Sequence, residues 1–250
     1  VFEQTNNDLE SNVNNYTDSH MEKGAVYDTE IFSSPMDAYM AKVEKSVLLE
    51  IVEKTLNGNL GNYVDFACGT GRIISSLEKC ATKSIGVDVS QSMVDIAKEK
   101  CERTQFFIKD VTKERLDFPP IDVVTSFRFF GNAQQELRDS VLQYLHSILR
   151  KDGLLILNNH RNPVSISNRL FSLSGGDHEM DLTYDKLRES LNRQGFTVLK
   201  TLGIGGWIFR HSFQRKEILE SKMANVLERV SRVVVPTSLC PDMILIAKKH

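Results

Sequence analysis

The sequence predicts an α/β protein with a doubly wound, seven-stranded and mostly parallel sheet. Short apolar runs alternate with segments whose apolar residues recur at helical spacing, the pattern of a parallel sheet covered on both faces. In addition, the turn Gly69-Thr70-Gly71 directly follows the first apolar run, and Asp88 ends the second run about twenty residues later. That offset is typical of a cofactor-cradling loop and an acid that binds a ribose. We therefore expect a ligand at the carboxyl edge of this sheet.

The amino-terminal part is expected to be a segment followed by a helical cap. Residues 1–34 are rich in Asn, Asp, Ser and Thr, which predicts a flexible segment before the folded domain at 35–250. Ser34 followed by Pro35 is typical of a helix start, and Gly58 can end that helix. The apolar spacing of this helix favours packing over one sheet edge, and Tyr27 and Tyr39 are further candidates for closing over a ligand.

The seven predicted strands span residues 63–67, 84–89, 105–109, 121–127, 154–158, 196–202 and 243–247. Helices are expected to begin at Arg72, after Ser90, near Leu137 and at Thr183, the third closed by Lys151-Asp152-Gly153. Residues 214–231 predict a further amphipathic helix, whose apolar stripe we expect to pack over the sheet or a lid rather than to form a dimer. Residues 161–182 interrupt the alternation and predict an inserted loop. Together with 203–236 they are interpreted as substrate-side insertions.

Composition excludes several classes of protein. The net charge of -2 leaves no broad basic surface for nucleic acid. No apolar run approaches the roughly 20 residues of a membrane span, so we expect no membrane partner. The four cysteines are scattered without paired spacing, which favours a reducing cytoplasmic location. Because the chain begins with Val, it is expected to be trimmed or cut from a longer polypeptide.

Three interpretations compete for the glycine turn: a purely structural turn, a nicotinamide dinucleotide site, and a different nucleoside site. The dinucleotide fingerprint needs a third small residue three positions after its second glycine, and this chain has Ile74 there. The stretch from Asp65 to Gly71 instead resembles the first motif of class I S-adenosylmethionine-dependent methyltransferases, an acid followed by small residues at alternate positions. Ala67 stands in place of that motif's first glycine.

The resemblance covers residues 35–250 and implies a Rossmann-like methyltransferase fold with an N-terminal helical cap and a lid insertion. It implies that the last strand runs antiparallel between the fifth and sixth. It also implies S-adenosylmethionine as the cofactor, with the backbone of Ala67, Cys68, Gly69 and Gly71 close to its methionine half. Asp65 would interact with its amino group, and Asp88 would accept hydrogen bonds from both ribose hydroxyls.

The same resemblance assigns the rest of the cofactor site. Val89 and Met93 would line the adenine. Asp110 would contact the adenine amino group, and Val111 would donate its backbone N–H to the adenine ring. Ser126 and Phe127 would lie beneath the sulfonium.

Candidate residues for the methyl acceptor follow the fourth and fifth strands. Phe129 and Phe130 are interpreted either as a stacking surface for a planar acceptor or as core. This segment lacks the Asp/Asn-Pro-Pro-Tyr/Phe motif of methyltransferases that act on base amino groups or glutamine. His160 is the candidate general base, with a solvent-facing or hydrogen-bonded histidine as the alternative. Arg161 is a candidate either for binding a substrate carboxylate or phosphate or for a surface ion pair. Trp207 is a candidate for a lid or substrate contact, with simple packing as the favoured alternative.

The resulting prediction is a cytoplasmic methyltransferase, a monomer or homodimer, that acts on an oxygen or nitrogen of a small molecule or sugar. The reaction would be an in-line displacement that produces S-adenosylhomocysteine. No metal is expected, because no paired acids follow the fourth and fifth strands. The alternatives are an NAD(P)-dependent oxidoreductase and a non-catalytic S-adenosylmethionine-binding regulator. Protein methylation is a lower option.

Overall fold

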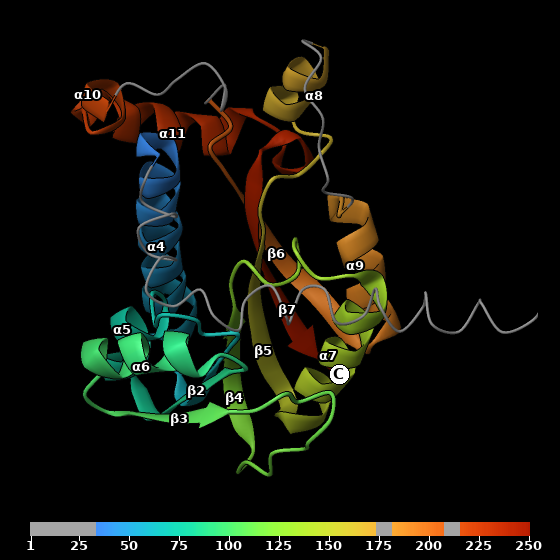
Figure 1. The fold of residues 1–250 in the computed structure, drawn as a ribbon. Coiled ribbons are helices and arrows are strands. Elements are labelled where there is room, and N and C mark those ends of the chain that lie inside the picture. The colour runs from blue at the N-terminus through green and yellow to red at the C-terminus, as the bar shows by residue number, and fades with distance from the viewer. Residues whose placement is uncertain (1–33, 174–181, 208–215) are drawn as a thin grey trace, which may run out of the picture.

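The computed structural model describes residues 34–173, 182–207 and 216–250, to which every structural statement below refers. The expectations for residues 1–33, including Tyr27, and for 174–181 and 208–215 lie outside this part of the chain. Figure 1 shows a single sheet in the centre of the described residues, with the strand order β3-β2-β1-β4-β5-β7-β6. The strands are β1 (Gly61–Phe66), β2 (Ala81–Asp88), β3 (Thr104–Ile108), β4 (Ile121–Ser126), β5 (Leu149–Asn159), β6 (Phe196–Ile204) and β7 (Asp242–Lys249).

Strand β7 decides the architecture. It pairs antiparallel with both β5 and β6, whereas the pairs among β1 to β5 are parallel. The predicted seven-stranded sheet, with its last strand antiparallel between the fifth and sixth, is therefore confirmed. Since the ends of β1, β2, β4 and β5 meet at one edge, side chains that follow these strands are brought together there.

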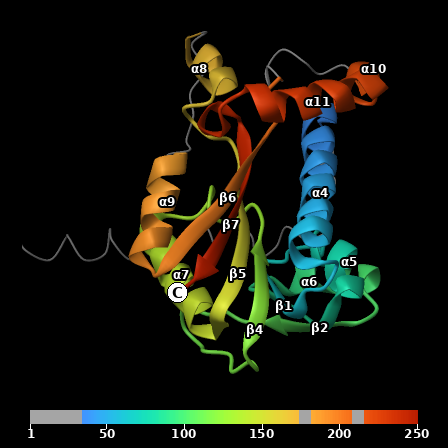
Figure 2. The same ribbon diagram turned by 180° about the vertical axis from the view of Figure 1, so that it is seen from behind.

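Helices cover both faces of the sheet (Figures 1 and 2). They are α4 (Pro35–Leu56), α5 (Ile74–Leu77), α6 (Gln91–Lys100), α7 (Gln135–Ile148), α8 (Ile166–Leu173), α9 (Tyr184–Arg193), α10 (Lys216–Leu219) and α11 (Lys222–Val234), with short 3-10 turns at Glu78–Cys80 and Thr237–Leu239. One hydrophobic core joins α7 and α9 to the sheet, and a second joins α4 and α5 to its other face. Helices α10 and α11 lie across the upper end of α4, at the carboxyl edge.

The start of α4 is as predicted. Ser34 is the N-cap, its hydroxyl accepting a hydrogen bond from the Asp37 N–H, and Pro35 occupies the first turn. The helix ends at Asn57 and Gly58, both in the left-handed region with φ of 52° and 73°. Its buried side holds a continuous row of apolar side chains together with one acid, Glu44.

The connection between β3 and β4 contains no helix: residues 109–120 form turns and extended chain, and Phe118 packs edge-on against Phe107 at 5.5 Å. One helix end differs from the prediction, since the segment Lys151-Asp152-Gly153 does not terminate α7. Leu149 already pairs with Ile121 of β4, so the chain is in the sheet before Asp152 turns it with a φ of 61°.

The insertion at 161–182 was expected to be a loop, and its described part contains α8. Residues 214–231 were expected to form one helix, but Ser221 caps α11 separately from α10 by accepting a hydrogen bond from the Ala224 N–H. In both places a polar, Ser-containing segment obscures a helix start in the sequence, because Ser serves equally well in loops and at N-caps.

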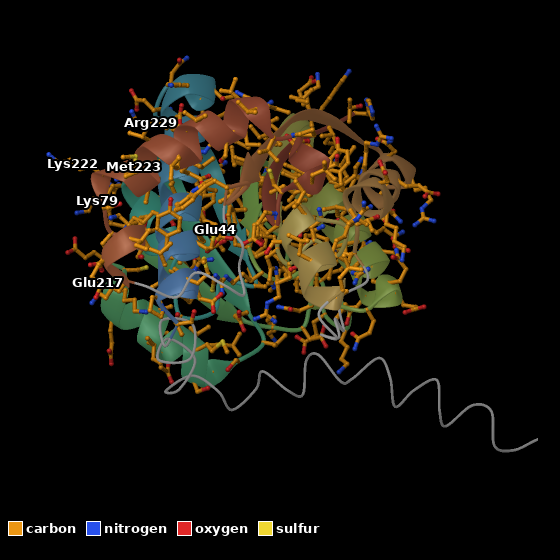
Figure 3. The ribbon with its side chains drawn as sticks, turned by 90° about the horizontal axis from the view of Figure 1, so that it is seen from above. Glu44, Lys79, Glu217, Lys222, Met223 and Arg229 are labelled. Carbon is orange, nitrogen blue, oxygen red and sulfur yellow. The ribbon has the colours of Figure 1, made fainter. Side chains whose placement is uncertain are left out.

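The expected orientation of the last helix was wrong. The apolar stripe of α11 faces outward, with Met223 64% and Val233 87% exposed, while Glu228 is buried on its inner side. Glu228 accepts hydrogen bonds from the Gly205 N–H and the Trp207 indole N–H, so the loop after β6 is what requires an acid on this face. Figure 3 shows Met223 at the outer side of α11.

Candidate active site

Two adjoining pockets open at the carboxyl edge of the sheet. The first is mostly apolar and lies over the ends of β1, β2 and β4. Its lining is Phe66, Ala67, Gly69, Val87, Asp88, Val89, Met93, Lys109, Asp110, Val111, Thr112, Phe127, Arg128, Phe129, Leu137 and Val141. The second pocket lies against the glycine turn and is lined by Asp65, Ala67, Cys68, Gly69, Thr70, Arg72, Ile73, Phe127 and Arg128. Of the predicted cofactor residues, all but Gly71 and Ser126 line one or both pockets.

The glycine turn forms the floor that the two pockets share. Ala67 and Gly69 are both left-handed, with φ of 54° and 52°, so the backbone curls back on itself directly after β1. Gly71, with φ of 78°, has a different role. A Cβ at this position would come within 2.9 Å of the Ala97 Cβ, so Gly71 allows the turn to pack against α6. It lies outside both pocket linings.

Asp88 supports the turn and lines the first pocket. Its Oδ2 accepts a hydrogen bond from the Gly69 N–H at 2.7 Å, and its Oδ1 accepts one from the Ser90 N–H at 2.9 Å. Each carboxylate oxygen can accept more than one hydrogen bond. Asp88 can therefore hold the turn in shape and still accept the hydroxyl groups of a ribose.

Part of the lining of the first pocket suits an adenine. Val89, Met93 and Val111 supply apolar walls there, and Asp110 supplies a carboxylate. Partial burial works to raise the pKa of Asp110, but hydrogen bonds from Thr112 and the nearby Lys113 ammonium hold it below its usual value. The group is thus an acceptor at neutral pH, as contact with an exocyclic amino group requires.

Asp65 is the most perturbed acid of the site. It is buried at the end of β1, its Oδ1 accepts a hydrogen bond from the Thr125 hydroxyl at 2.6 Å, and its Oδ2 has no hydrogen-bond partner in the described part of the chain. Burial raises the pKa of Asp65 to about 7, an effect that the Thr125 hydrogen bond and the Arg72 guanidinium only partly offset. A cation that reaches Oδ2 would satisfy this acid.

The aromatic acceptor candidates separate into three groups. Phe129 lines the first pocket, whereas Phe130 is fully buried and packs edge-on against it at 5.1 Å. Tyr39 and Trp207 meet each other edge-on at 6.0 Å near α11, where the Tyr39 hydroxyl donates to the Ala224 carbonyl. These two rings join α4 to the loop after β6, and neither lines the two pockets.

The polar residues after β4 and β5 lie mainly outside the pockets. The Ser126 side chain is completely buried. His160 is 6% exposed and its ring packs against Gly131, close enough that a Cβ there would come within 2.9 Å of it. Arg161 is exposed in the left-handed region with a φ of 58°, and its N–H donates to Asp242 Oδ1. Neither His160 nor Arg161 belongs to the pocket linings, and both roles stay predictions.

Sequence reasoning missed a charged cluster beside the second pocket. Glu44 of α4 is completely buried, with its Oε2 2.9 Å from Arg72 Nη1 and 3.9 Å from Arg128 Nε. Asn158, at the end of β5, donates to Glu44 Oε1 at 2.5 Å. A signal for Glu44 was present, since it lies four residues after Met40 and four before Leu48 on the buried side of the helix.

Two absences concern the described residues only. No helix there is long and apolar enough to cross a membrane. Over the same ranges, no group of three or more His, Cys, Asp and Glu side chains is arranged to hold a metal ion.

Comparison with known proteins finds relatives of the central part of the chain. Residues 64–153 match a family described as a methyltransferase domain. An uncharacterized methyltransferase from Bacillus cytotoxicus is 28% identical over 151 residues, which cover 60% of this chain and 63% of that protein. A putative methyltransferase from a Geobacillus species is 30% identical over 141 residues, which cover 54% of each chain. These matches thus span less than two thirds of either relative.

Similar solved structures extend over nearly the whole chain. Magnesium protoporphyrin IX methyltransferase from Synechocystis PCC 6803 with bound S-adenosylhomocysteine has a TM-score of 0.64 at 18% identity, covering 94% of this chain and 98% of that one. The N-methyltransferase NodS from Bradyrhizobium japonicum, also with S-adenosylhomocysteine, has a TM-score of 0.60 at 9% identity, covering 95% and 98%. At these identities the likeness shows the fold.

Proposed function

We propose that this chain, a class I S-adenosylmethionine-dependent methyltransferase, transfers the methyl group of its cofactor to an oxygen or nitrogen of a small molecule or sugar. One observation carries the proposal. The first pocket is apolar with Asp88 and Asp110 in its lining, as a nucleoside requires, and the second is lined by the glycine turn and a buried acid, as an amino acid requires. S-adenosylmethionine consists of these two halves, joined at a sulfonium.

The junction of the pockets is where the reactive methyl group would lie. Four residues line both pockets, namely Ala67, Gly69, Phe127 and Arg128. With the cofactor bound, the acceptor's lone pair would attack the methyl carbon while the carbon–sulfur bond breaks, and the bonding electrons would stay on the sulfur of S-adenosylhomocysteine. The protein's contribution is to align these three atoms and exclude water, because the positive charge of the sulfonium is dispersed in the transition state.

The acceptor would approach from the carboxyl edge beyond this junction. Phe129, which lines the first pocket and is 4% exposed, is the proposed contact for a planar acceptor. Arg161, Tyr39 and Trp207, which line neither pocket, are further proposed contacts. His160 is the proposed general base, needed only for an acceptor that is protonated at the working pH. One structural relative is named a magnesium protoporphyrin IX methyltransferase, which favours a small acceptor.

The dinucleotide alternative receives no support from the geometry. Ile74, at the position where the dinucleotide fingerprint needs a small residue, is fully buried beneath the turn. Calorimetric titration with S-adenosylhomocysteine and with NADH separates the two activities. We expect micromolar or tighter binding of the former and none of the latter. Binding of NADH, or failure to bind S-adenosylhomocysteine, would refute the proposal.

Turnover then separates an enzyme from a non-catalytic binder. The protein is incubated with S-adenosylmethionine carrying a labelled methyl group and with a panel of phenols, carboxylic acids, amines and amino sugars. We expect labelled product and an equal amount of S-adenosylhomocysteine with at least one acceptor class. If the label instead appears in added proteins and in no small acceptor, the small-molecule assignment is wrong.

A further inference from the structure

We propose that a groove between α4, β6 and α11 is a second binding site, which takes one molecule of an organic phosphate, that is, a phosphate group joined to an apolar body. The groove has a volume of about 600 Å³. Its lining shares no residue with the two pockets at the glycine turn, so the inference goes beyond the proposed methyl transfer and does not rest on it.

Four cationic side chains line this groove, which we call the basic groove. They are Lys54 of α4, Lys200 of β6, and Arg229 and Arg232 of α11. Glu50 is the acid in the lining, and Arg232 also contacts the buried Glu228, with its Nε 3.3 Å from Oε1. Two carboxylates therefore face four cations, in a chain whose net charge is -2.

Glu50 shows how an anion is held in the basic groove. Lys54 Nζ is 2.6 Å from its Oε1, and Arg232 Nη1 is 3.6 Å from its Oε2. The hydrogen bond from Lys54, together with the charges of Lys54, Arg232 and Lys200, holds the pKa of Glu50 below its usual value against the opposing effect of burial. Lys200 is thus close enough to act on the same carboxylate from the β6 side.

Lys200 and Arg229 are the cations that remain for a ligand. In the described ranges neither forms an ion pair, whereas Lys54 and Arg232 both do. A phosphate monoester carries a charge of about -1.5 to -2 at pH 7, which two cations balance and which a single carboxylate does not supply. Arginine and lysine are both common phosphate ligands, and the hydroxyl groups of Ser46 and Thr55 in the same lining are further donors.

The rest of the lining favours an apolar body beside the phosphate. Ile51, Leu202 and Val233 contribute apolar surface to the basic groove. Val233 also belongs to the exposed apolar side of α11, which continues away from the groove through Val230 and Val226. An apolar group next to the phosphate would remove part of this surface from water, whereas inorganic phosphate would leave it exposed.

The shape of the basic groove fits a single molecule rather than the surface of a membrane. Its walls come from three elements, and its volume lies within the roughly 300–1,000 Å³ that is typical of small-molecule sites. The cations are placed at different depths in it. Arg229 lies at the outer side of α11 (Figure 3), whereas the side chain of Arg232 is 20% exposed and is held by two acids.

A simpler explanation is that these are ordinary surface cations, solvated by water. Both explanations allow weak binding of any anion through net charge. They differ in whether binding depends on Lys200 and Arg229 in particular, and in whether an apolar body strengthens it.

Calorimetric titration with three ligands makes that distinction. The first is dihexanoylphosphatidic acid below its micelle concentration, the second is dihexanoylphosphatidylcholine, which has the same chains but no net charge, and the third is inorganic phosphate. For the unmodified protein we expect the first ligand to bind at least about tenfold more tightly than either of the others, because it alone combines a net negative phosphate with an apolar body.

A pair of double variants locates the site. Lys200→Gln combined with Arg229→Gln should weaken binding of dihexanoylphosphatidic acid by about 5- to 30-fold, the effect of two partly exposed charge contacts. Both side chains are exposed, so stability to urea and affinity for S-adenosylhomocysteine should stay unchanged. The matched control, Lys98→Gln with Arg188→Gln, removes the same charge from exposed positions on α6 and α9 and should bind like the unmodified protein.

Weaker binding in the groove variant alone supports the inference. Equal binding of the three ligands, no binding of dihexanoylphosphatidic acid, or equal weakening in the control variant would refute it. Binding that appears only with vesicles containing phosphatidic acid, measured by sedimentation, would refute it as well, because the partner would then be a membrane surface. All of these outcomes leave the methyltransferase assignment standing, since titration with S-adenosylhomocysteine tests that assignment separately.

Discussion

The buried acid Asp65 provides a test in which stability and cofactor binding should move in opposite directions. Its pKa of about 7 means that the empty protein holds the Asp65 side chain largely protonated at pH 5.5 and largely ionised at pH 7.5. An ammonium group binds well only to the ionised form. The ratio of ionised fractions at these two pH values is about 25, so affinity for S-adenosylhomocysteine should rise by roughly that factor across this range. An α-amino group keeps its proton over most of it.

The sign for stability is the reverse. Because the pKa of Asp65 is raised in the folded protein, the folded state binds more protons than the unfolded state between the usual value of 3.8 and about 7. The free energy of unfolding of the ligand-free protein should therefore fall as pH rises through this window, by up to about 4 kcal/mol for a shift of three pKa units.

Asp65→Asn removes the titration while its side-chain oxygen can still accept the Thr125 hydrogen bond. At pH 7.5 we expect urea unfolding to show that this variant is more stable than the unmodified protein. At the same pH it should bind S-adenosylhomocysteine at least tenfold more weakly, and its affinity should not rise between pH 5.5 and pH 7.5. The matched control is Asp152→Asn, at an exposed left-handed position on the opposite edge, which should keep the unmodified profile. A flat profile in the unmodified protein, or an unchanged rise in Asp65→Asn, would refute the reasoning.

Three other substitutions test separate parts of the structure. Asp88→Ala should weaken S-adenosylhomocysteine binding by about 10- to 100-fold in calorimetry, through lost ribose contacts and a loosened turn, and unchanged affinity would mean that the ribose assignment is wrong. Ala67→Gly should raise the free energy of unfolding by about 0.5–1 kcal/mol, because the position is left-handed with a φ of 54°, and a loss of stability would contradict this. Glu228→Ala should lower the free energy of unfolding by about 2–4 kcal/mol, since two buried N–H donors lose their acceptor. The exposed control Glu217→Ala should change the free energy of unfolding by less than about 0.5 kcal/mol. Equal effects of the two substitutions would show that Glu228 does not support the loop after β6.

Features that depend on neighbours in the sequence were predicted correctly. The caps at Ser34, Ser90 and Thr183 each receive a hydrogen bond from a backbone N–H three residues later, so a short stretch contains all the atoms involved. The contact between Gly69 and Asp88 spans more of the chain, but it depends only on two adjacent parallel strands, because Gly69 follows β1 and Asp88 ends β2. The lining of the first pocket was therefore largely within reach of the sequence.

Features that depend on packing against residues from distant parts of the chain were not predicted correctly. The spacing of apolar residues in α11 defines an apolar side of the helix but not whether that side faces the core or the solvent. The buried side instead holds Glu228, because the loop after β6 presents two N–H donors to it. His160 illustrates the same limit. Its place after β5 suggested chemistry at the open edge, whereas its ring packs against Gly131.

The chain alone thus predicted the sheet and the edge at which its pockets open, because alternating apolar runs, glycine turns and strand-end acids act locally. The antiparallel last strand followed from the family resemblance and not from a local pattern. Only the tertiary structure brought Glu44, Arg72 and Arg128 together. They come from a helix, a turn and a strand end far apart in sequence, and each alone reads as an ordinary charged residue. Their pairing depends on how α4 crosses the edge of the sheet, a long-range packing arrangement that no local pattern encodes.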